Sequence, residues 1–185
     1  KYSFRVKKRT TSDMTTEKSH TKVIDQVRQD EAQRLAIANK LGFTDVKALQ
    51  NAATHNRRLF PASKERLLDA YRGNLDRMRT KLPHLFGRLP KAPLVVMAVH
   101  AFSEKDQAAA YYEHGSPDGS RPGMVYVKTY QFETRSLADV DDTADHRGLP
   151  GHTLQISLAQ EPTEGPAFRQ DPGQTTERQS EVPEH

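Results

Sequence analysis

Apolar residues recur at helical spacing in the first half of the chain. Over residues 21–41, apolar side chains are separated by about one or two helical turns, at Val23, Val27, Leu35, Ala38 and Leu41. This spacing is typical of one face of a helix, and Gly42 follows as a stop signal. A shorter helix is predicted over residues 45–55. A third is predicted to begin after Ser63 as N-cap and to end near Leu82.

The pattern changes after Pro83. Four prolines and glycines mark a loop, namely Pro83, Gly87, Pro90 and Pro93. The apolar, largely β-branched run 94–99 predicts a buried strand, and 108–112 and 124–130 predict two more, joined by the turn-rich stretch 115–123. Helices are predicted again over 137–145 and 154–160. We therefore expect a mainly α protein with a small antiparallel β-sheet, in the α+β class.

Composition suggests how the chain is organised. Only 35% of the residues are hydrophobic, and most of these lie between residues 23 and 159. We expect a polar N-terminal tail over residues 1–20 and a single partial domain over residues 21–164. Residues 165–185 are rich in Pro, Gly, Gln and Glu, which predicts a disordered tail. A domain with so thin a core indicates association with a missing domain or subunit.

Charge and residue content exclude several classes. The net charge of +4 comes from 28 basic and 24 acidic residues. Such a small excess is typical of a solvated surface, so no nucleic-acid partner is expected. No apolar run approaches the ~18 residues that a membrane span needs, and no apolar segment follows the basic N-terminus as it would in a secretory signal. The chain has no cysteine, so disulfides and thiolate metal sites are excluded.

Two histidines supply the candidate chemistry. His146 and His152 flank Pro150 and Gly151, and neutral imidazoles are good zinc ligands. On an unbroken helix, positions six apart point about 120° away from each other. The Pro-Gly break would allow both rings to face one site. From spacing alone, two unrelated histidines near a helix break are the simpler interpretation, because His-x5-His is a weak pattern.

The segment around these histidines resembles the signature of a bacterial family of unknown function, DUF885. The family pattern is His-Glu-x-x-Pro-Gly-His-His-Leu-Gln, and it is matched by His146, Pro150, Gly151, His152, Leu154 and Gln155. Similar blocks occur at 82–90, 110–123, 158–161 and 166–169. The resemblance extends over roughly residues 16–170 and implies the middle portion of a thimet-type metallopeptidase scaffold. By resemblance, His146 and His152 would hold zinc and the substrate would be peptide-like.

This chain departs from the family pattern at the residues that would carry catalysis. Arg147 stands where the resemblance implies a glutamate general base, and a guanidinium cannot accept a proton. Thr153 replaces the second of the paired histidines. The glutamate that completes the site in the family lies on a downstream helix, and the sequence after Gln170 does not resemble that helix. We therefore expect zinc binding to be weak or absent and catalysis to be impaired or lost.

The predicted hairpin offers two further candidates. By resemblance, Tyr112 and Arg121 lie on the substrate side; alternatively, Tyr112 packs within a strand and Arg121 belongs to a turn. Two hypotheses for the function remain. The chain is a fragment or degraded member of a zinc-dependent, peptidase-like hydrolase family, or it is a non-catalytic binding module that uses its hairpin and helical surface. The sequence leaves periplasmic, secreted and cytoplasmic locations open.

Overall fold

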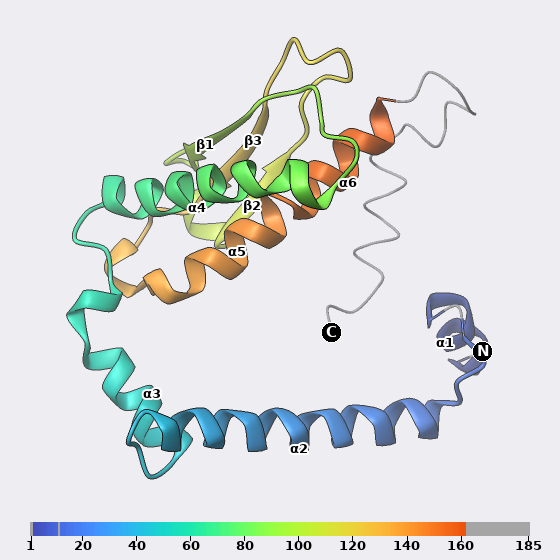
Figure 1. The fold of residues 1–185 in the computed structure, drawn as a ribbon, viewed down its shortest axis with the longest axis vertical. Helices are drawn as coiled ribbons and strands as arrows, with labels where there is room; N and C mark the ends of the chain where they lie inside the picture. The colour runs from blue at the N-terminus through green and yellow to red at the C-terminus, as the bar shows by residue number, and fades with distance from the viewer. Residues whose placement is uncertain (1, 11, 162–185) are drawn as a thin grey trace. The chain divides into compact units, whose positions relative to one another are not determined.

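A computed structural model describes residues 2–10 and 12–161, which fall into two compact units (Figure 1). One unit comprises residues up to 56, and the other begins at residue 57. The predicted tail over residues 165–185 lies outside the described residues. Among the described residues, no helix has the length and apolar character that crossing a bilayer requires.

The first unit is helical throughout. It contains α1 (Tyr2–Thr10), α2 (Thr16–Lys40) and α3 (Val46–His55). Thr15 caps α2 by accepting a hydrogen bond from the Lys18 amide, so this helix begins five residues before the predicted start at residue 21. Asp45 caps α3 through the Ala48 amide at 2.8 Å. The helices predicted over residues 21–41 and 45–55 are confirmed, and the polar stretch 1–20 is also largely helical.

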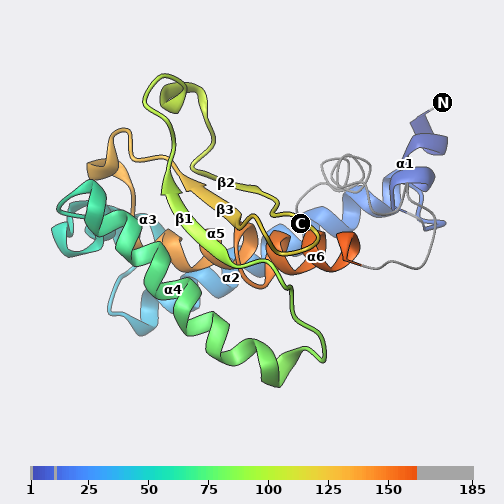
Figure 2. The same cartoon turned by 90° about the horizontal axis from the view of Figure 1, so that it is seen from above.

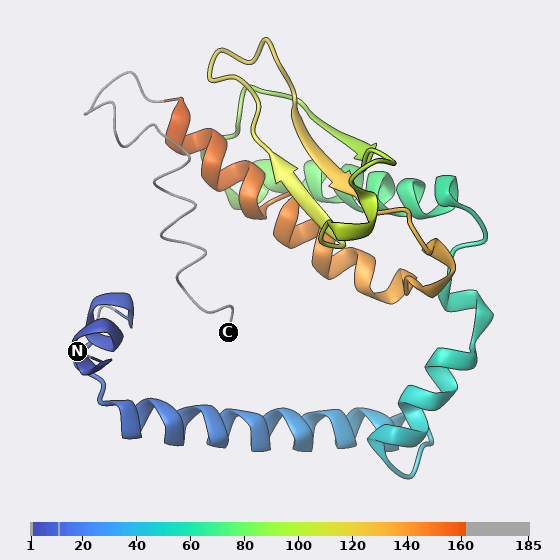
Figure 3. The same cartoon turned by 180° about the vertical axis from the view of Figure 1, so that it is seen from behind.

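The second unit contains the sheet. In chain order its elements are the short 3-10 helix η1 (Arg57–Leu59), α4 (Lys64–Leu85), β1 (Leu94–Ala98), η2 (Glu104–Asp106), β2 (Ala110–Glu113), β3 (Gly123–Val127), η3 (Phe132–Thr134), η4 (Leu137–Asp139), α5 (Val140–Arg147) and α6 (Gly151–Gln160). Helix α4 lies along β1 and α5 lies along β2, on the same face of the sheet (Figures 1 and 3). The α+β class is confirmed.

Helix α4 begins as predicted and ends later. Ser63 accepts a hydrogen bond from the Arg66 amide at 3.1 Å, as expected of an N-cap. Pro83 does not stop the helix, which continues to Leu85. The missing amide of Pro83 removes one hydrogen bond close to the end of the helix. The buried side chain of Leu82 and the bond from the Phe86 amide to the Leu82 carbonyl, 2.9 Å long, hold the last turn.

The sheet is mixed, whereas an antiparallel sheet was expected. Its strand order is β1-β3-β2; β2 pairs antiparallel with β3, and β1 pairs parallel with β3. The chain reverses direction twice, once between β1 and β2 and again through residues 114–122. The second reversal inserts β3 between the two earlier strands, so β3 runs in the direction of β1 (Figure 2).

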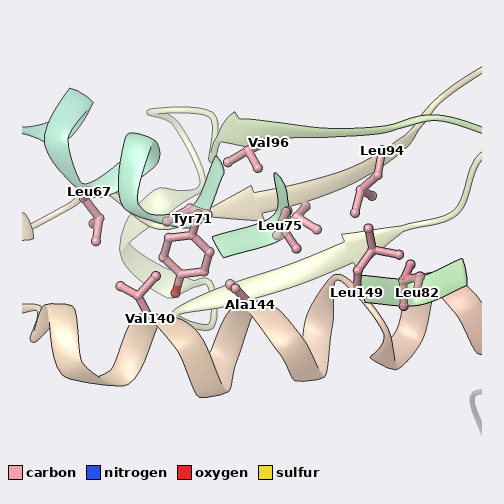
Figure 4. Packing of buried hydrophobic residues seen from close by; sticks show 12 residues of the cluster. Leu67, Tyr71, Leu75, Leu82, Leu94, Val96, Val140, Ala144 and Leu149 are labelled. Atoms are coloured by element: carbon pink, nitrogen blue, oxygen red, sulfur yellow. The ribbon is translucent and has the colours of Figure 1, made fainter. Parts of the chain in front are cut away.

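The core lies between the sheet and the two helices α4 and α5 (Figure 4). Its buried members are Leu67, Tyr71, Leu75, Leu82, Leu94, Val96, Ala110, Val125, Val127, Val140, Ala144 and Leu149. In β3, Val125 and Val127 are almost fully buried, and the ring of Tyr126 stacks on Tyr111 at 5.0 Å. This core fixes α5, and therefore the start of the segment that carries the histidines.

Candidate functional site

The candidate site lies where α5 ends and α6 begins. Helix α5 ends at Arg147 and α6 begins at Gly151, with only residues 148–150 between them. The Gly148 amide donates to the Ala144 carbonyl at 2.8 Å, and the Thr153 amide donates to the Gly148 carbonyl at 3.1 Å. These two bonds join the helices without a loop. The break predicted at Pro150-Gly151 is therefore present, and it is very short.

Two glycines make this junction possible. A Cβ atom on Gly148 would lie 2.6 Å from both the Ala144 carbonyl oxygen and a methyl carbon of Leu75. A Cβ atom on Gly151 would overlap the carbonyl oxygen of His146. Contacts this short exclude any larger residue without movement of the backbone. The backbones of α5 and α6 consequently approach more closely than other residues would allow.

The junction places the two imidazoles beside each other. The ring centroids of His146 and His152 are 4.9 Å apart, and their planes are nearly perpendicular, at 82°. His146 is exposed and His152 is half-buried. The structure therefore brings together two candidate ligands that an unbroken helix would hold apart.

Arg147 contacts one of the two rings. Its Nη1 atom lies 3.1 Å from Nε2 of His152. A guanidinium can only donate hydrogen bonds, so Nε2 must accept, and in this contact the imidazole uses its lone pair. Metal coordination at Nε2 would require the same lone pair. Arg147 thus competes directly with a metal ion for His152.

The described residues do not fit a complete catalytic zinc site. Such a site uses three protein ligands and one open position. Across residues 2–10 and 12–161, no cluster of three or more histidine or carboxylate side chains is close enough to hold an ion. The nearest acid in sequence, Asp145, is half-buried, and its Oδ1 atom has no hydrogen-bond partner among the described residues. Burial, with a smaller contribution from the charge of Asp141, raises the pKa of Asp145.

The two hairpin residues have structural contacts. The hydroxyl of Tyr112 lies 3.3 Å from Oγ of Ser157, which links β2 to α6. Arg121 forms part of the turn, because its amide donates to Oγ of Ser116 at 2.8 Å and its carbonyl accepts from the Ser116 amide. The side chain of Arg121 is exposed. Tyr112 is therefore connected to the helix that carries His152, whereas the contacts of Arg121 lie within its own turn.

Glu161 supplies a buried carboxylate at the end of α6 that the sequence pattern did not indicate. The side chain of Glu161 is only 2% exposed. It accepts hydrogen bonds from the Lys91 amide at 2.7 Å and from Arg88 at 3.2 Å. These hydrogen bonds connect the loop after α4 to the end of α6. Both segments fall in blocks that resemble the family, but nothing in the hydrophobic periodicity connects them.

Comparisons with known proteins identify the fold and the family. A solved structure described as a lipoprotein from Colwellia psychrerythraea matches 85% of this chain with a TM-score of 0.77 and 20% sequence identity. The match covers 28% of that protein, so this chain spans less than a third of its length. At this identity the likeness concerns the fold alone. A search of the curated proteins gave no match.

The chain also matches a protein family along almost its whole length. Residues 1–176 match the family described as "Bacterial protein of unknown function (DUF885)". The matched range includes α1 to α6 and the histidine junction. The chain therefore belongs to the DUF885 family.

Proposed function

We propose that this chain is a catalytically impaired relative of a zinc-dependent hydrolase that acts on peptide-like bonds. The observation that carries this proposal is the contact of Arg147 with Nε2 of His152, at 3.1 Å. This contact unites two features of the proposed site. One is a pair of histidines suited to a metal centre, and the other is a cationic side chain that occupies the lone pair of one histidine nitrogen.

The histidine pair supports descent from a metal site. Rings 4.9 Å apart at a glycine-dependent junction are close enough to share one ion after a small rotation. Such a junction tolerates few sequences, because a Cβ atom on Gly148 or Gly151 would collide with the backbone of α5. A role in positioning the two rings accounts for this restriction.

Arg147 accounts for the loss of catalysis. General-base assistance typically contributes about 10²–10⁴ in rate, and a guanidinium cannot provide it. Its permanent positive charge also repels a divalent cation. With only two histidines and a nearby arginine, we expect the chain to hold zinc weakly and to turn over peptide-like substrates very slowly or not at all.

The alternative function, a non-catalytic interaction module, is favoured by a separate observation. Several apolar side chains of α2 are exposed, among them Val23 at 52% and Ile37 at 54%. Large apolar side chains gathered on one exposed surface often mark a binding site for another protein. This function does not require the histidine junction and is compatible with an inactive site.

Zinc titration tests the main proposal. Isothermal calorimetry with Zn²⁺, and visible absorption with Co²⁺, would be measured for the unaltered chain, for His146→Ala/His152→Ala and for Arg147→Glu. We expect the first two to bind alike. Arg147→Glu should bind at least roughly tenfold more tightly, because exchanging a positive for a negative charge within about 5 Å of a divalent ion changes the interaction by more than ~1.4 kcal/mol.

A matched control separates charge from coordination. Arg147→Met removes the cation and its hydrogen bond without adding a ligand, and it should give an affinity between those of the unaltered chain and Arg147→Glu. Equal, weak binding by all variants would show that the two histidines are not the remnant of a metal site. Stoichiometric zinc in the unaltered chain, lost on removal of the histidines and accompanied by peptide hydrolysis, would overturn the assignment of an impaired enzyme.

A further inference from the structure

Helix α2 carries a largely exposed stripe of side chains along one face. The stripe comprises Val23, Val27, Asp30, Arg34, Ile37 and Leu41. Asp30 is half-buried and accepts a hydrogen bond from Gln26, and the other five are exposed. The four apolar members are between 46% and 60% exposed. Helix α3 packs against a different side of α2, where Ala38 is fully buried. Within its own unit the stripe is therefore open.

The spacing of the stripe is that of a helix–helix contact. Its members follow one another at alternating intervals of four and three residues, which is the repeat of a two-helix seam. On a helix these positions lie within one narrow strip. The two central members are charged and of opposite sign, Asp30 and Arg34, and the outer four are apolar.

The order of residue types along the stripe is nearly symmetric about its midpoint. About a midpoint at residue 32, Val23 corresponds to Leu41 and Val27 to Ile37, so apolar positions exchange with apolar positions. At the centre, Asp30 corresponds to Arg34, so a negative charge exchanges with a positive one. A surface with this property is complementary to a second copy of itself turned through 180°.

We propose that α2 is a dimer interface, in which it packs antiparallel against α2 of a second copy of this chain. In a two-fold symmetric pair every contact occurs twice. Asp30 of each copy meets Arg34 of the other, and each Val27 meets Ile37 of the other copy. The dimer involves the first unit only, so it is independent of the function proposed for the histidine junction.

Charge complementarity selects a second copy over an unrelated partner. A purely apolar groove on a different protein would offer no opposite charges to the central Asp30 and Arg34, and burying these two side chains unpaired is unfavourable. In the antiparallel pair, each of the two charges faces the opposite charge of the other copy. In a parallel pair, Asp30 would face Asp30 and Arg34 would face Arg34, so like charges would meet.

The expected dimer is weak and reversible. Helix α2 has 25 residues and is about 37 Å long, so a single pair of such helices lies near the lower limit of stable interfaces, ~1,200 Å². One flank of the seam opposes dimerisation, because Glu31 of each copy faces Glu31 of the other. Glu31→Gln should therefore tighten the dimer.

Charge reversal tests the pairing. The mass of the full chain in solution would be measured by light scattering and sedimentation equilibrium over a wide range of concentration. We expect a monomer–dimer equilibrium. Asp30→Arg and Arg34→Asp should each weaken it by at least roughly tenfold, because each creates two like-charge contacts. The double variant Asp30→Arg/Arg34→Asp should restore it, and circular dichroism should show unchanged helix content in all three.

Engineered cysteines test the register, since the chain contains no natural cysteine. Val27→Cys/Ile37→Cys places thiols opposite each other across the seam, and mild oxidation should yield covalent dimers. Within one copy the two positions are too far apart on the helix to bridge. Val23→Cys/Ile37→Cys, whose thiols are out of register, should yield far fewer. A chain that stays monomeric at every concentration, or a double charge variant that fails to restore the dimer, would overturn the proposal.

Discussion

Gly151 begins α6 directly against the backbone of His146, with no space between them for a side chain. A Cβ atom on Gly151 would overlap the His146 carbonyl oxygen and lie 2.7 Å from that of Asp145. This close approach is what turns α6 so that His152 comes back beside His146. The geometry of the candidate site therefore depends on a residue that contributes no side chain to it.

Replacing Gly151 should disrupt the junction. Gly151→Ala forces the two backbones apart, and overpacking of this severity should lower the free energy of unfolding by about 3 kcal/mol. Urea denaturation followed by circular dichroism measures the change. Gly73→Ala is the matched control, because a Cβ there meets only Nη1 of Arg77 at 3.8 Å.

The control should change stability in the opposite direction. Gly73 lies inside α4, where alanine is favoured over glycine by roughly 0.5–1 kcal/mol. Gly73→Ala should therefore stabilise the second unit slightly. Comparable stability of the two variants would show that the α5–α6 junction can widen without loss.

Local signals in the sequence predicted most of the elements. Ser63 and Asp45 act as helix caps in the structure, and the apolar stripes of α2 and α4 lie on helices as expected. These features depend on neighbours within four residues, which is the range that periodicity can detect. The order of the strands depends on contacts between segments far apart, and the pattern of the strands carries no information on it.

In the candidate site, too, the sequence indicated the features that depend on neighbouring residues and not those that depend on distant segments. The Pro-Gly break and the two histidines are local, and the sequence identified them. The contact between Tyr112 and Ser157 and the burial of Glu161 join segments 45 and 70 residues apart. No rule of spacing connects such pairs. The approach of Arg147 to His152 is local, but its direction depends on the exact turn between α5 and α6.

Glu104 should make stability depend on pH. Its carboxylate accepts hydrogen bonds from the amide and the hydroxyl of Thr129. Burial alone would raise the pKa of Glu104, but these bonds and one from the Tyr130 amide outweigh burial and lower it below the ordinary 4.5. A lowered pKa in the folded state stabilises the protein above pH 4.5, and this stabilisation is lost as the pH falls through the folded-state value.

Glu104→Gln removes the charge and keeps the shape. At neutral pH it should lower the free energy of unfolding by about 1 kcal/mol, because hydrogen bonds to charged groups are stronger than neutral ones. The difference should shrink as the pH falls below 4.5, where the natural side chain also becomes neutral. Denaturation curves over a series of pH values measure it, with the exposed Glu113→Gln as control. A difference that stays constant with pH would contradict the assigned role.

Thr153 should be replaceable by an apolar residue with a gain in stability. Its side chain is 2% exposed, and within the described residues its hydroxyl oxygen has no hydrogen-bond partner. A buried hydroxyl without a partner typically costs about 1–3 kcal/mol. Thr153→Val replaces it with a methyl group of similar size and should raise the free energy of unfolding by about 1 kcal/mol in urea denaturation.

Thr153→Ser tests the cause of that gain. It keeps the hydroxyl and deletes the methyl group, so it should lower stability by roughly 1 kcal/mol. A loss of stability in Thr153→Val would instead mean that the hydroxyl forms a bond in solution. Adjacent positions on a helix point about 100° apart, so Thr153 faces the core while His152 faces His146. Changes at residue 153 should accordingly alter stability without changing zinc affinity, which separates the core of α6 from the histidine junction.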